Sequence, residues 1–321
     1  MNSIFLHLSI ADWVNDHVQS FVAAYGDSFH DFSTALLRYV LVPLEGALRA
    51  TPPWAILIAV GLLTLNATRR IGIAGFFVLL LYVIGCFGLW DKLMQTLALM
   101  LVATVLSVVL GVPLGIWASR SPWMRRVLLP VLDIMQTLPS FVYLIPVLML
   151  FGLGKVPAIL ATIIYALPPL IRLTDLGIRQ VDPDVTEAAR AFGTTRWQLL
   201  VNVQLPLARP SIMAGINQTT MMALSMVVIA SMIGSRGLGE DVLAGIQTLD
   251  VGKGTQAGLA IVILAIVIDR ISQGFGQERR ARRRLAQQRR QKGASRVPYR
   301  LPRKAQPAGV DSNQATQSSR A

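Results

Sequence analysis

Seven apolar segments, separated by short polar loops, constrain the fold of this chain more than any other feature of its sequence. A helix needs roughly 20 residues, within a range of about 17–25, to cross a bilayer, and all the segments except the short first one come near this length. Mean hydropathy is +0.54, and 53% of the residues are hydrophobic against 15% charged. The pattern predicts an all-α integral membrane protein with about seven transmembrane helices. The segments are residues 54–67, 71–90, 93–118, 128–151, 156–173, 205–233 and 257–271.

The predicted membrane domain, residues 53–275, is flanked by two segments of different character. Residues 1–52 carry apolar sets at helical spacing on both sides of Gly26, which predicts two amphipathic helices lying on the membrane or packing on the spans. In the predicted tail, residues 276–321, basic residues predominate. Thirteen Lys and Arg residues against two acidic ones follow residue 271, which accounts for +11 of the formal +13. We predict a disordered tail that anchors on anionic lipid; an ionic-strength sensor is the alternative, and nucleic-acid binding is not expected.

The distribution of Lys and Arg in the short loops predicts the orientation. Ten such residues fall in loops on one side of the predicted membrane and four on the other. The more basic side is normally cytoplasmic, which puts the C-terminus in the cytoplasm and the N-terminal segment outside. The glycine-rich loop 234–256 then faces outward, and its apolar residues at helical spacing predict a short interfacial helix.

A polar, helix-prone stretch, residues 184–206, joins the fifth and sixth apolar segments on the predicted cytoplasmic side. Thr186 can cap a short helix whose first turn carries Glu187, a favourable place for an acid next to the positive end of the helix dipole. Gly193 can end this helix, and a second helix is expected from about Thr195. Such a helical loop predicts a contact with a partner in the aqueous phase.

The spacing of residues in this stretch resembles the EAA loop of binding-protein-dependent ABC importer permeases. That family usually has Ile where Val203 stands, so the match is close but not complete. The resemblance implies the type I ABC importer permease fold and a coupling helix that docks in a groove of a cytoplasmic ATPase. It implies that the Glu anchors the helix, the two Ala residues permit close packing and the Gly makes the turn. The coupling residues predicted from it are Glu187, Ala188, Ala189, Gly193, Leu205 and Pro206.

Polar and helix-breaking residues interrupt the fourth apolar segment. Pro139 lacks a backbone donor, and irregular backbone is tolerated at membrane depth only where protein or a watery cavity covers it. These residues, with polar ones in the sixth segment, are candidates to line a translocation pathway; a kinked packing helix and interhelical hydrogen bonds are the alternatives. The candidates are Gln136, Thr137, Pro139, Ser140, Tyr143, Asn217 and Thr220.

The fourth segment also resembles a narrower group, the permeases of glycine betaine/proline and related quaternary-ammonium importers. The resemblance rests on the run from Leu138 to Pro146 followed by Phe151-Gly152-Leu-Gly-Lys, and on the order of elements over residues 1–275. It implies a homodimer of permease subunits in the bacterial inner membrane, two cytoplasmic ATPases and an extracytoplasmic substrate-binding protein. Recognition of quaternary ammonium needs an aromatic cage, which the sequence does not display. The resemblance implies selection by the binding protein, which we prefer; a cage that forms only in the fold is the alternative.

Motifs of other function classes are missing from the sequence. It contains no H-E-x-x-H, G-x-S-x-G or Walker A pattern and no cysteine–histidine cluster, so we expect no catalytic residue, no cofactor and no metal, with ATP hydrolysed by a partner. An importer of methionine or another small amino acid is the nearest alternative. An ion-gradient transporter is less favoured because it needs ionisable residues in mid-span, and Asp133 and Asp269 lie near predicted cytoplasmic ends. A membrane scaffold without transport does not explain the polar fourth segment.

Overall fold

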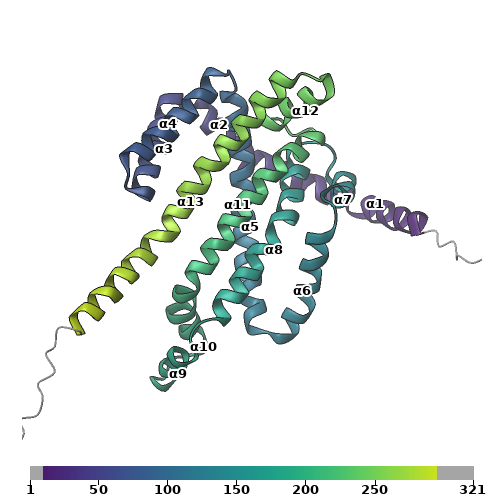
Figure 1. The fold of residues 1–321 in the computed structure, drawn as a ribbon. Coiled ribbons are helices and arrows are strands. Elements are labelled where there is room, and N and C mark those ends of the chain that lie inside the picture. The colour runs from purple at the N-terminus through teal and green to yellow at the C-terminus, as the bar shows by residue number, and fades with distance from the viewer. Residues whose placement is uncertain (1–9, 295–321) are drawn as a thin grey trace, which may run out of the picture. The chain divides into compact units, whose positions relative to one another are not determined.

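The computed structural model describes residues 10–294, and over that range the chain is built of helices with no strand. This confirms the all-α prediction (Figure 1). The chain divides into two compact units, Met1–Arg279 and Arg280–Ala321, and the helices described below belong to the first except for the end of α13. The helices, with two π-helical segments η1 and η2, are α1 Ile10–Leu36, η1 Leu37–Leu41, α2 Val42–Ala50, α3 Pro53–Thr68, α4 Ile71–Cys86, α5 Trp90–Arg120, α6 Pro122–Thr137, α7 Ser140–Phe151, α8 Lys155–Arg179, α9 Pro183–Ala191, α10 Arg196–Gln198, η2 Leu199–Gln204, α11 Leu205–Met232, α12 Leu238–Thr248 and α13 Val251–Ala294.

Helices α5, α8 and α11 run side by side at the centre of the first unit (Figure 1). They approach closely because glycines face the neighbouring helix. A Cβ added at Gly115 of α5 would lie 2.6 Å from the Cβ of Thr174, and one added at Gly177 of α8 would lie 2.6 Å from the Cβ of Ser211. Small residues at such crossings are the usual basis of helix packing inside membranes, where lipid removes most of the hydrophobic driving force.

The seven predicted segments are all helical, but they are not seven straight spans. Four helices are long and apolar enough to cross a membrane, or six if each of two bent helix pairs forms one span, and Ile71–Cys86 is a shorter apolar helix. The central spans extend beyond the predicted limits, because their polar ends continue as helix past the apolar windows. The four long helices are Trp90–Arg120, Lys155–Arg179, Arg196–Met232 and Val251–Gly274.

The predicted fourth span, residues 128–151, is two helices rather than one. Helices α6 and α7 meet at a bend of 100°, where Leu138 adopts an extended backbone with φ −65° and ψ 134° immediately before Pro139. The proline ring disfavours the helical region for the residue before it and removes a backbone donor. Pro168 and Pro169 do not break α8 in the same way, because both are buried in the span that its neighbours cover most completely.

Two predictions for the terminal segments are corrected. Instead of two helices separated at Gly26, α1 continues through this glycine to Leu36, since one glycine inside a helix costs only about 1 kcal/mol. The chain then remains helical to Ala50 and turns by 102° into α3. At the other end α13 is helical to Ala294, where disorder was expected from residue 276. The remaining part of the predicted tail, 295–321, lies outside the described residues, as do residues 1–9.

Candidate functional site: the loop between two central spans

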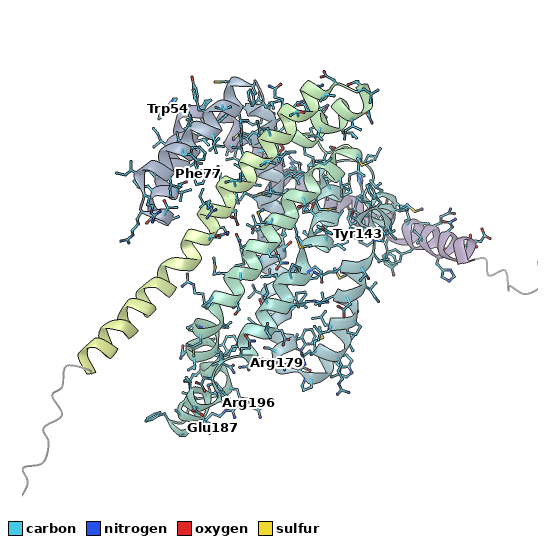
Figure 2. The ribbon with its side chains drawn as sticks, in the orientation of Figure 1. Trp54, Phe77, Tyr143, Arg179, Glu187 and Arg196 are labelled. Atoms are coloured by element: carbon cyan, nitrogen blue, oxygen red, sulfur yellow. The ribbon has the colours of Figure 1, made fainter. Side chains whose placement is uncertain are left out.

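Helix α9 projects at the end of the central helices, opposite to the end that carries α12 (Figure 1). Figure 2 shows Glu187 at the tip of this end, beyond Arg196 and Arg179. No residue of α9 is buried, so the helix contributes nothing to the core of the isolated chain. A helix held in place without a buried face of its own must be fixed by its two ends.

The start of α9 is fixed by Asp182 and Pro183. The Asp182 carboxylate accepts a hydrogen bond of 3.0 Å from the backbone N–H of Asp184, and Pro183 occupies the first helical position, where no donor is needed. The prediction that Thr186 caps this helix is wrong, since its hydroxyl donates to the Pro183 carbonyl at 2.8 Å from inside the first turn. The sequence signal was present, because an Asp-Pro pair is a common helix start.

The end of α9 confirms the role predicted for Gly193 as a helix terminator. Its φ is +79°, a left-handed conformation that glycine adopts without strain. Its N–H donates to the Arg190 carbonyl at 2.9 Å, and the N–H of Thr194 donates to the Ala189 carbonyl at 3.3 Å. These two bonds form a Schellman motif, which satisfies the last carbonyls of the helix.

A second helix begins directly after this turn, as predicted from about Thr195. Thr195 and Gln198 form a reciprocal capping box, with bonds of 3.3 Å from the Gln198 N–H to the Thr195 hydroxyl and 2.9 Å from the Thr195 N–H to the Gln198 side chain. The helix continues through η2 into α11, with Leu205 and Pro206 at the first two positions of α11. Leu200 is buried against α8 and α11, so the loop is anchored on the bundle after α9 rather than by it.

Large apolar side chains of this loop lie in solvent in the isolated chain. Phe192, at the end of α9, is 90% exposed, and Trp197 is 69% exposed. Glu187, on the same loop, is also exposed. Exposed apolar residues on a well-capped loop are typical of a protein contact surface.

The residues predicted to line a pathway fall into two groups. Gln136, Thr137 and Pro139 lie exposed at the bend between α6 and α7, and Ser140 is half-buried in the first turn of α7. Tyr143 is buried one turn further on, and its hydroxyl has no hydrogen-bond partner. The bend therefore puts polar groups and an unpaired hydroxyl at one point of the fold.

The second group is engaged in contacts between or within helices. The Asn217 side chain donates to the Asp269 carboxylate at 3.0 Å and accepts from the Ser272 hydroxyl at 2.6 Å, both on α13. The Thr220 hydroxyl donates to the Ile216 carbonyl of its own helix at 2.8 Å. The Asn217 bonds match the alternative stated above, in which polar residues of this segment hold helices together, whereas the Thr220 bond stays within α11.

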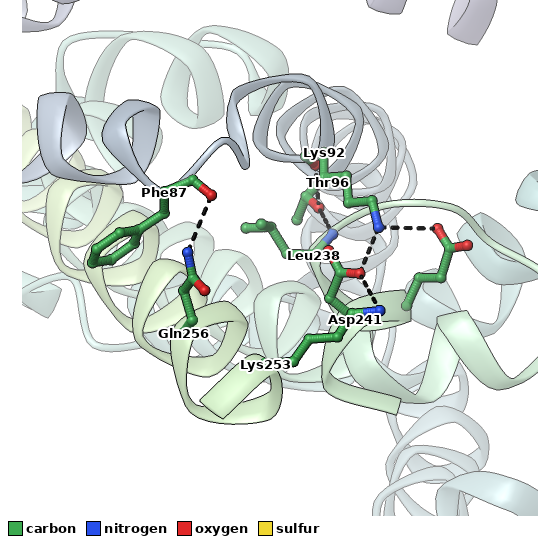
Figure 3. Close-up of polar contacts among 8 residues, drawn as sticks. Phe87, Lys92, Thr96, Leu238, Asp241, Lys253 and Gln256 are labelled. Carbon is green, nitrogen blue, oxygen red and sulfur yellow. Dashed lines mark hydrogen bonds and ion pairs between the residues drawn. The ribbon is translucent and has the colours of Figure 1, made fainter. Parts of the chain in front are cut away.

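The end of the central helices that carries α12, opposite to α9, holds a cluster of charged residues that the sequence did not predict as a unit. Asp241 of α12 is 5% exposed and lies 2.6 Å from the Lys92 Nζ and 3.6 Å from the Lys253 Nζ (Figure 3). Next to it the Thr96 hydroxyl accepts from the Leu238 N–H at 2.9 Å. The short helix predicted for loop 234–256 is confirmed as α12, but its partners on α5 and α13 are separated from it in sequence and left no local signal.

Comparison with known proteins assigns the class that this fold and loop define. Residues 111–280 match the family described as "Binding-protein-dependent transport system inner membrane component". The chain belongs to this family, the membrane permeases of ABC importers, and is thus a multi-pass inner membrane protein and a transport subunit.

Named relatives and a solved structure extend this assignment. The chain is 57% identical over 202 residues to the glycine betaine/proline betaine transport system permease protein ProW of Escherichia coli K12, covering 63% of this chain and 57% of that relative. It is 44% identical over 275 residues to the glycine betaine transport system permease protein OpuAB of Bacillus subtilis 168, covering 86% of this chain and 97% of the relative. The inward-facing MetNI methionine ABC transporter in its native crystal form aligns with a TM-score of 0.51 at 21% identity, over 59% of this chain and 93% of the other. That similarity shows the type I importer permease fold.

Proposed function

We propose that this chain forms the translocation pathway of an ATP-driven importer of glycine betaine, proline betaine and similar osmoprotectants. Two copies would form the permease, with two cytoplasmic ATPases and an extracytoplasmic binding protein. The chain itself would have no catalytic residue and no cofactor, so hydrolysis takes place in the partner. The substrate class is supported by the names of the relatives, which are betaine permeases in Escherichia coli and Bacillus subtilis.

The observation that carries the proposal is the geometry of α9. It is a capped helix without a buried residue, at the end of the central spans, with Glu187 in the middle of the helix and at the far end of the bundle (Figure 2). In the proposed complex Glu187 anchors α9 in the ATPase, Ala188 and Ala189 allow close approach, and Gly193 makes the turn. Leu205 and Pro206 begin the span that follows, so a displacement of α9 is transmitted to α11 through the continuous helix from Arg196.

The bend between α6 and α7 is our candidate for the pathway wall. Exposed Gln136 and Thr137, with Pro139 and Ser140, offer polar groups at a break in a membrane segment, and Tyr143 adds an unpaired hydroxyl. Backbone that departs from a helix within the membrane is stable only where protein or water satisfies it. Asn217 would support the pathway by holding α11 to α13, and Thr220, whose hydroxyl bonds within α11, remains a candidate lining residue.

The orientation in this proposal puts α9 and the C-terminus in the cytoplasm and the N-terminal segment and α12 outside. It rests on the excess of Lys and Arg in the loops at the α9 end. The basic residues after 271 would then face the anionic leaflet, which attracts each of them by about 1 kcal/mol near the surface.

A pull-down from the native host tests the coupling proposal. Glu187→Lys is compared with Asp184→Lys, which makes the same charge change on another exposed acid of the same helix. We expect wild type and Asp184→Lys to recover an ATPase and to support betaine uptake, and Glu187→Lys to lose both. Gly193→Asp, at the turn that ends α9, is a second variant expected to lose both. If Glu187→Lys and Gly193→Asp recover as much ATPase as wild type and support the same uptake, the loop is a connector and not a coupling site.

The substrate is tested separately, by uptake of labelled glycine betaine into proteoliposomes with the ATPase and binding protein. We expect unlabelled proline betaine to compete and methionine not to compete. Competition by methionine alone would replace the betaine assignment with an amino-acid importer and leave the permease assignment intact.

A further inference from the structure

Three arginines converge on one cavity beside α9. The cavity has a volume of about 370 Å³ and lies where the ends of α5 and α8 meet α9, α10 and η2. Its charged lining consists of Arg120, Arg190 and Arg196, and Ile178 and Leu199 form a buried apolar wall. A volume of this size falls within the range of roughly 300–1,000 Å³ typical of small-molecule sites.

The arginines of this cavity have no acidic partner among the residues that the structure describes. Among the residues whose side chains are described, the cavity lining holds no Asp or Glu, and none of the three guanidinium groups lies within 4.0 Å of a carboxylate. Arginines elsewhere at the same end are paired: Arg125 with Asp175 at 3.2 Å, and Arg172 with Asp133. Like charges brought together at the edge of a low-dielectric region repel unless a counter-charge lies between them.

One of the arginines is already held in position. Arg120 donates through one terminal nitrogen to the Arg196 carbonyl at 2.7 Å, which joins the end of α5 to the start of α10. The rest of its planar donor set remains available. Arg190 comes from α9, so the three groups reach the cavity from three separate elements. Positive groups that come from three elements and line one cavity are typical of an anion-binding site, whereas arginines along one helix form only a basic surface.

The cavity lies at the level where membrane spans end. Arg120 is the last residue of one candidate span, Ile178 is next to the last residue of the second, and Arg196 is the first residue of the third. Trp117 and Trp123 near these ends are both exposed. Exposed tryptophans are enriched at the height of lipid headgroups, so an anionic group available at this depth is a phosphate.

We propose that the cavity formed by Arg120, Arg190 and Arg196 binds a phosphate group, supplied by the headgroup of an anionic phospholipid or by free phosphate. Guanidinium groups recognise phosphate oxygens through paired, charge-assisted hydrogen bonds. The Gln204 side chain lines the same cavity and offers an additional polar contact. Because Arg190 lies on α9 and the other two at span ends, a bound phosphate stabilises the position of α9 relative to the bundle.

The general excess of positive charge at this end does not account for the cavity. Arg126 and Arg209 belong to the same basic set and are exposed like the three cavity arginines, but neither lines the cavity. They provide the matched control: Arg126→Gln/Arg209→Gln removes the same charge from the same end as Arg190→Gln/Arg196→Gln and leaves the three-arginine arrangement intact.

The test uses the full chain with two probes. In the first arm, wild type and the two double variants are placed in nanodiscs of phosphatidylcholine with phosphatidylglycerol, and native mass spectrometry counts the phosphatidylglycerol molecules retained per chain. In the second arm, inorganic phosphate is titrated into the protein in neutral detergent, with chloride at matched ionic strength, and the thermal unfolding midpoint is followed. Arg190→Lys/Arg196→Lys, which keeps the charge but not the planar donors, checks that a loss is due to recognition and not to misfolding.

In the first arm, wild type and the control variant should retain one phosphatidylglycerol molecule per chain more than Arg190→Gln/Arg196→Gln. In the second arm, they should bind phosphate with an affinity at least roughly tenfold higher than that of Arg190→Gln/Arg196→Gln. The lysine variant should fold as wild type does and bind with intermediate affinity. A difference in the first arm alone identifies the lipid headgroup as the source, and a difference in the second arm alone identifies free phosphate. Equal binding by both glutamine variants in both arms overturns the proposal. Equal phosphate binding combined with a selective loss of ATPase from the cavity variant overturns it too, in favour of an acidic side chain of the ATPase.

Discussion

The two ends of the central bundle differ in whether their charged residues are paired within the chain. At the α12 end, Asp241 is buried and both of its lysine partners come from the chain itself, at 2.6 and 3.6 Å. At the α9 end, three arginines share a cavity with no carboxylate, and Phe192 and Trp197 are exposed. At the first end the charges are paired within the chain, whereas the second has charges and apolar surface that no described residue covers. The difference indicates that α12 is held in place by the chain itself and that α9 is shaped for contact.

The glycines at the two ends are needed for different physical reasons. Gly239 at the start of α12 is needed for space, because a Cβ there would lie 2.4 Å from the Val227 carbonyl oxygen. Gly193 at the end of α9 is needed for its backbone angle, and a Cβ there would meet nothing within 4 Å. Tight packing holds α12, and hydrogen-bonded turns hold α9.

The largest effect is expected for Gly239→Ala. The added methyl meets backbone, which cannot rotate away, so α12 must move from α11 at a cost of about 3 kcal/mol. The measurement is the midpoint of thermal unfolding in one detergent. Gly258→Ala on α13, where nothing lies within 4 Å of the added methyl, is the control and should not lower the midpoint. Equal behaviour of the two variants would contradict the close packing of α12.

Asp241→Ala should have the next largest effect. It leaves Lys92 and Lys253 without their shared partner, and because both lysines are partly exposed the loss is nearer 2 kcal/mol than the value for a fully buried pair. Glu240→Ala removes an exposed acid 4.0 Å from Lys92 and should change the stability by less than about 0.5 kcal/mol. Thermal unfolding of both variants at low and high salt makes the comparison. If Glu240→Ala proves as damaging as Asp241→Ala, burial is not what distinguishes this cluster.

Gly193→Ala should have a smaller effect at the α9 end. A φ of +79° costs a residue with a Cβ about 1–2 kcal/mol, without any clash. Gly193→Asn should recover part of the loss, since asparagine tolerates left-handed backbone. Hydrogen exchange of residues 183–194 measures the local loss of stability, because the strain should open α9 and leave the amides of the bundle protected. Uniform loss of protection across the central helices would show that α9 is not an independent element.

The smallest effect on stability is expected for Phe192→Ser. A side chain that is 90% exposed contributes little to the folded chain, so the change should stay within about 0.5 kcal/mol. Leu200→Ser, at a buried position of the same loop, should instead unfold the anchor of the loop and lower the midpoint clearly. Phe192→Ser should nevertheless reduce recovery of the ATPase in the pull-down. Normal recovery would remove Phe192 from the contact surface.

The candidate loop could be predicted largely from sequence because its determinants are local. Gly193 ends a helix through its own backbone freedom, and the capping box of Thr195 and Gln198 spans only three residues. Asp182 is also a residue type that caps helices, but the cap predicted from the sequence is Thr186, whose hydroxyl bonds inside the first turn. The bend at Leu138 was only half predicted: Pro139 signalled an irregularity, but not a turn of 100° that separates two helices.

The sequence by itself determined the membrane class, the helical content, the α9 loop and its turn, because hydropathy and capping act over a few residues. Only the tertiary structure decided that Lys92 and Lys253 meet at Asp241, that Asn217 joins α13, and that Arg120, Arg190 and Arg196 share one cavity. These groups come from different helices that meet only in the folded chain. The energy of such contacts depends on distances between segments far apart in the chain, which local sequence patterns do not encode.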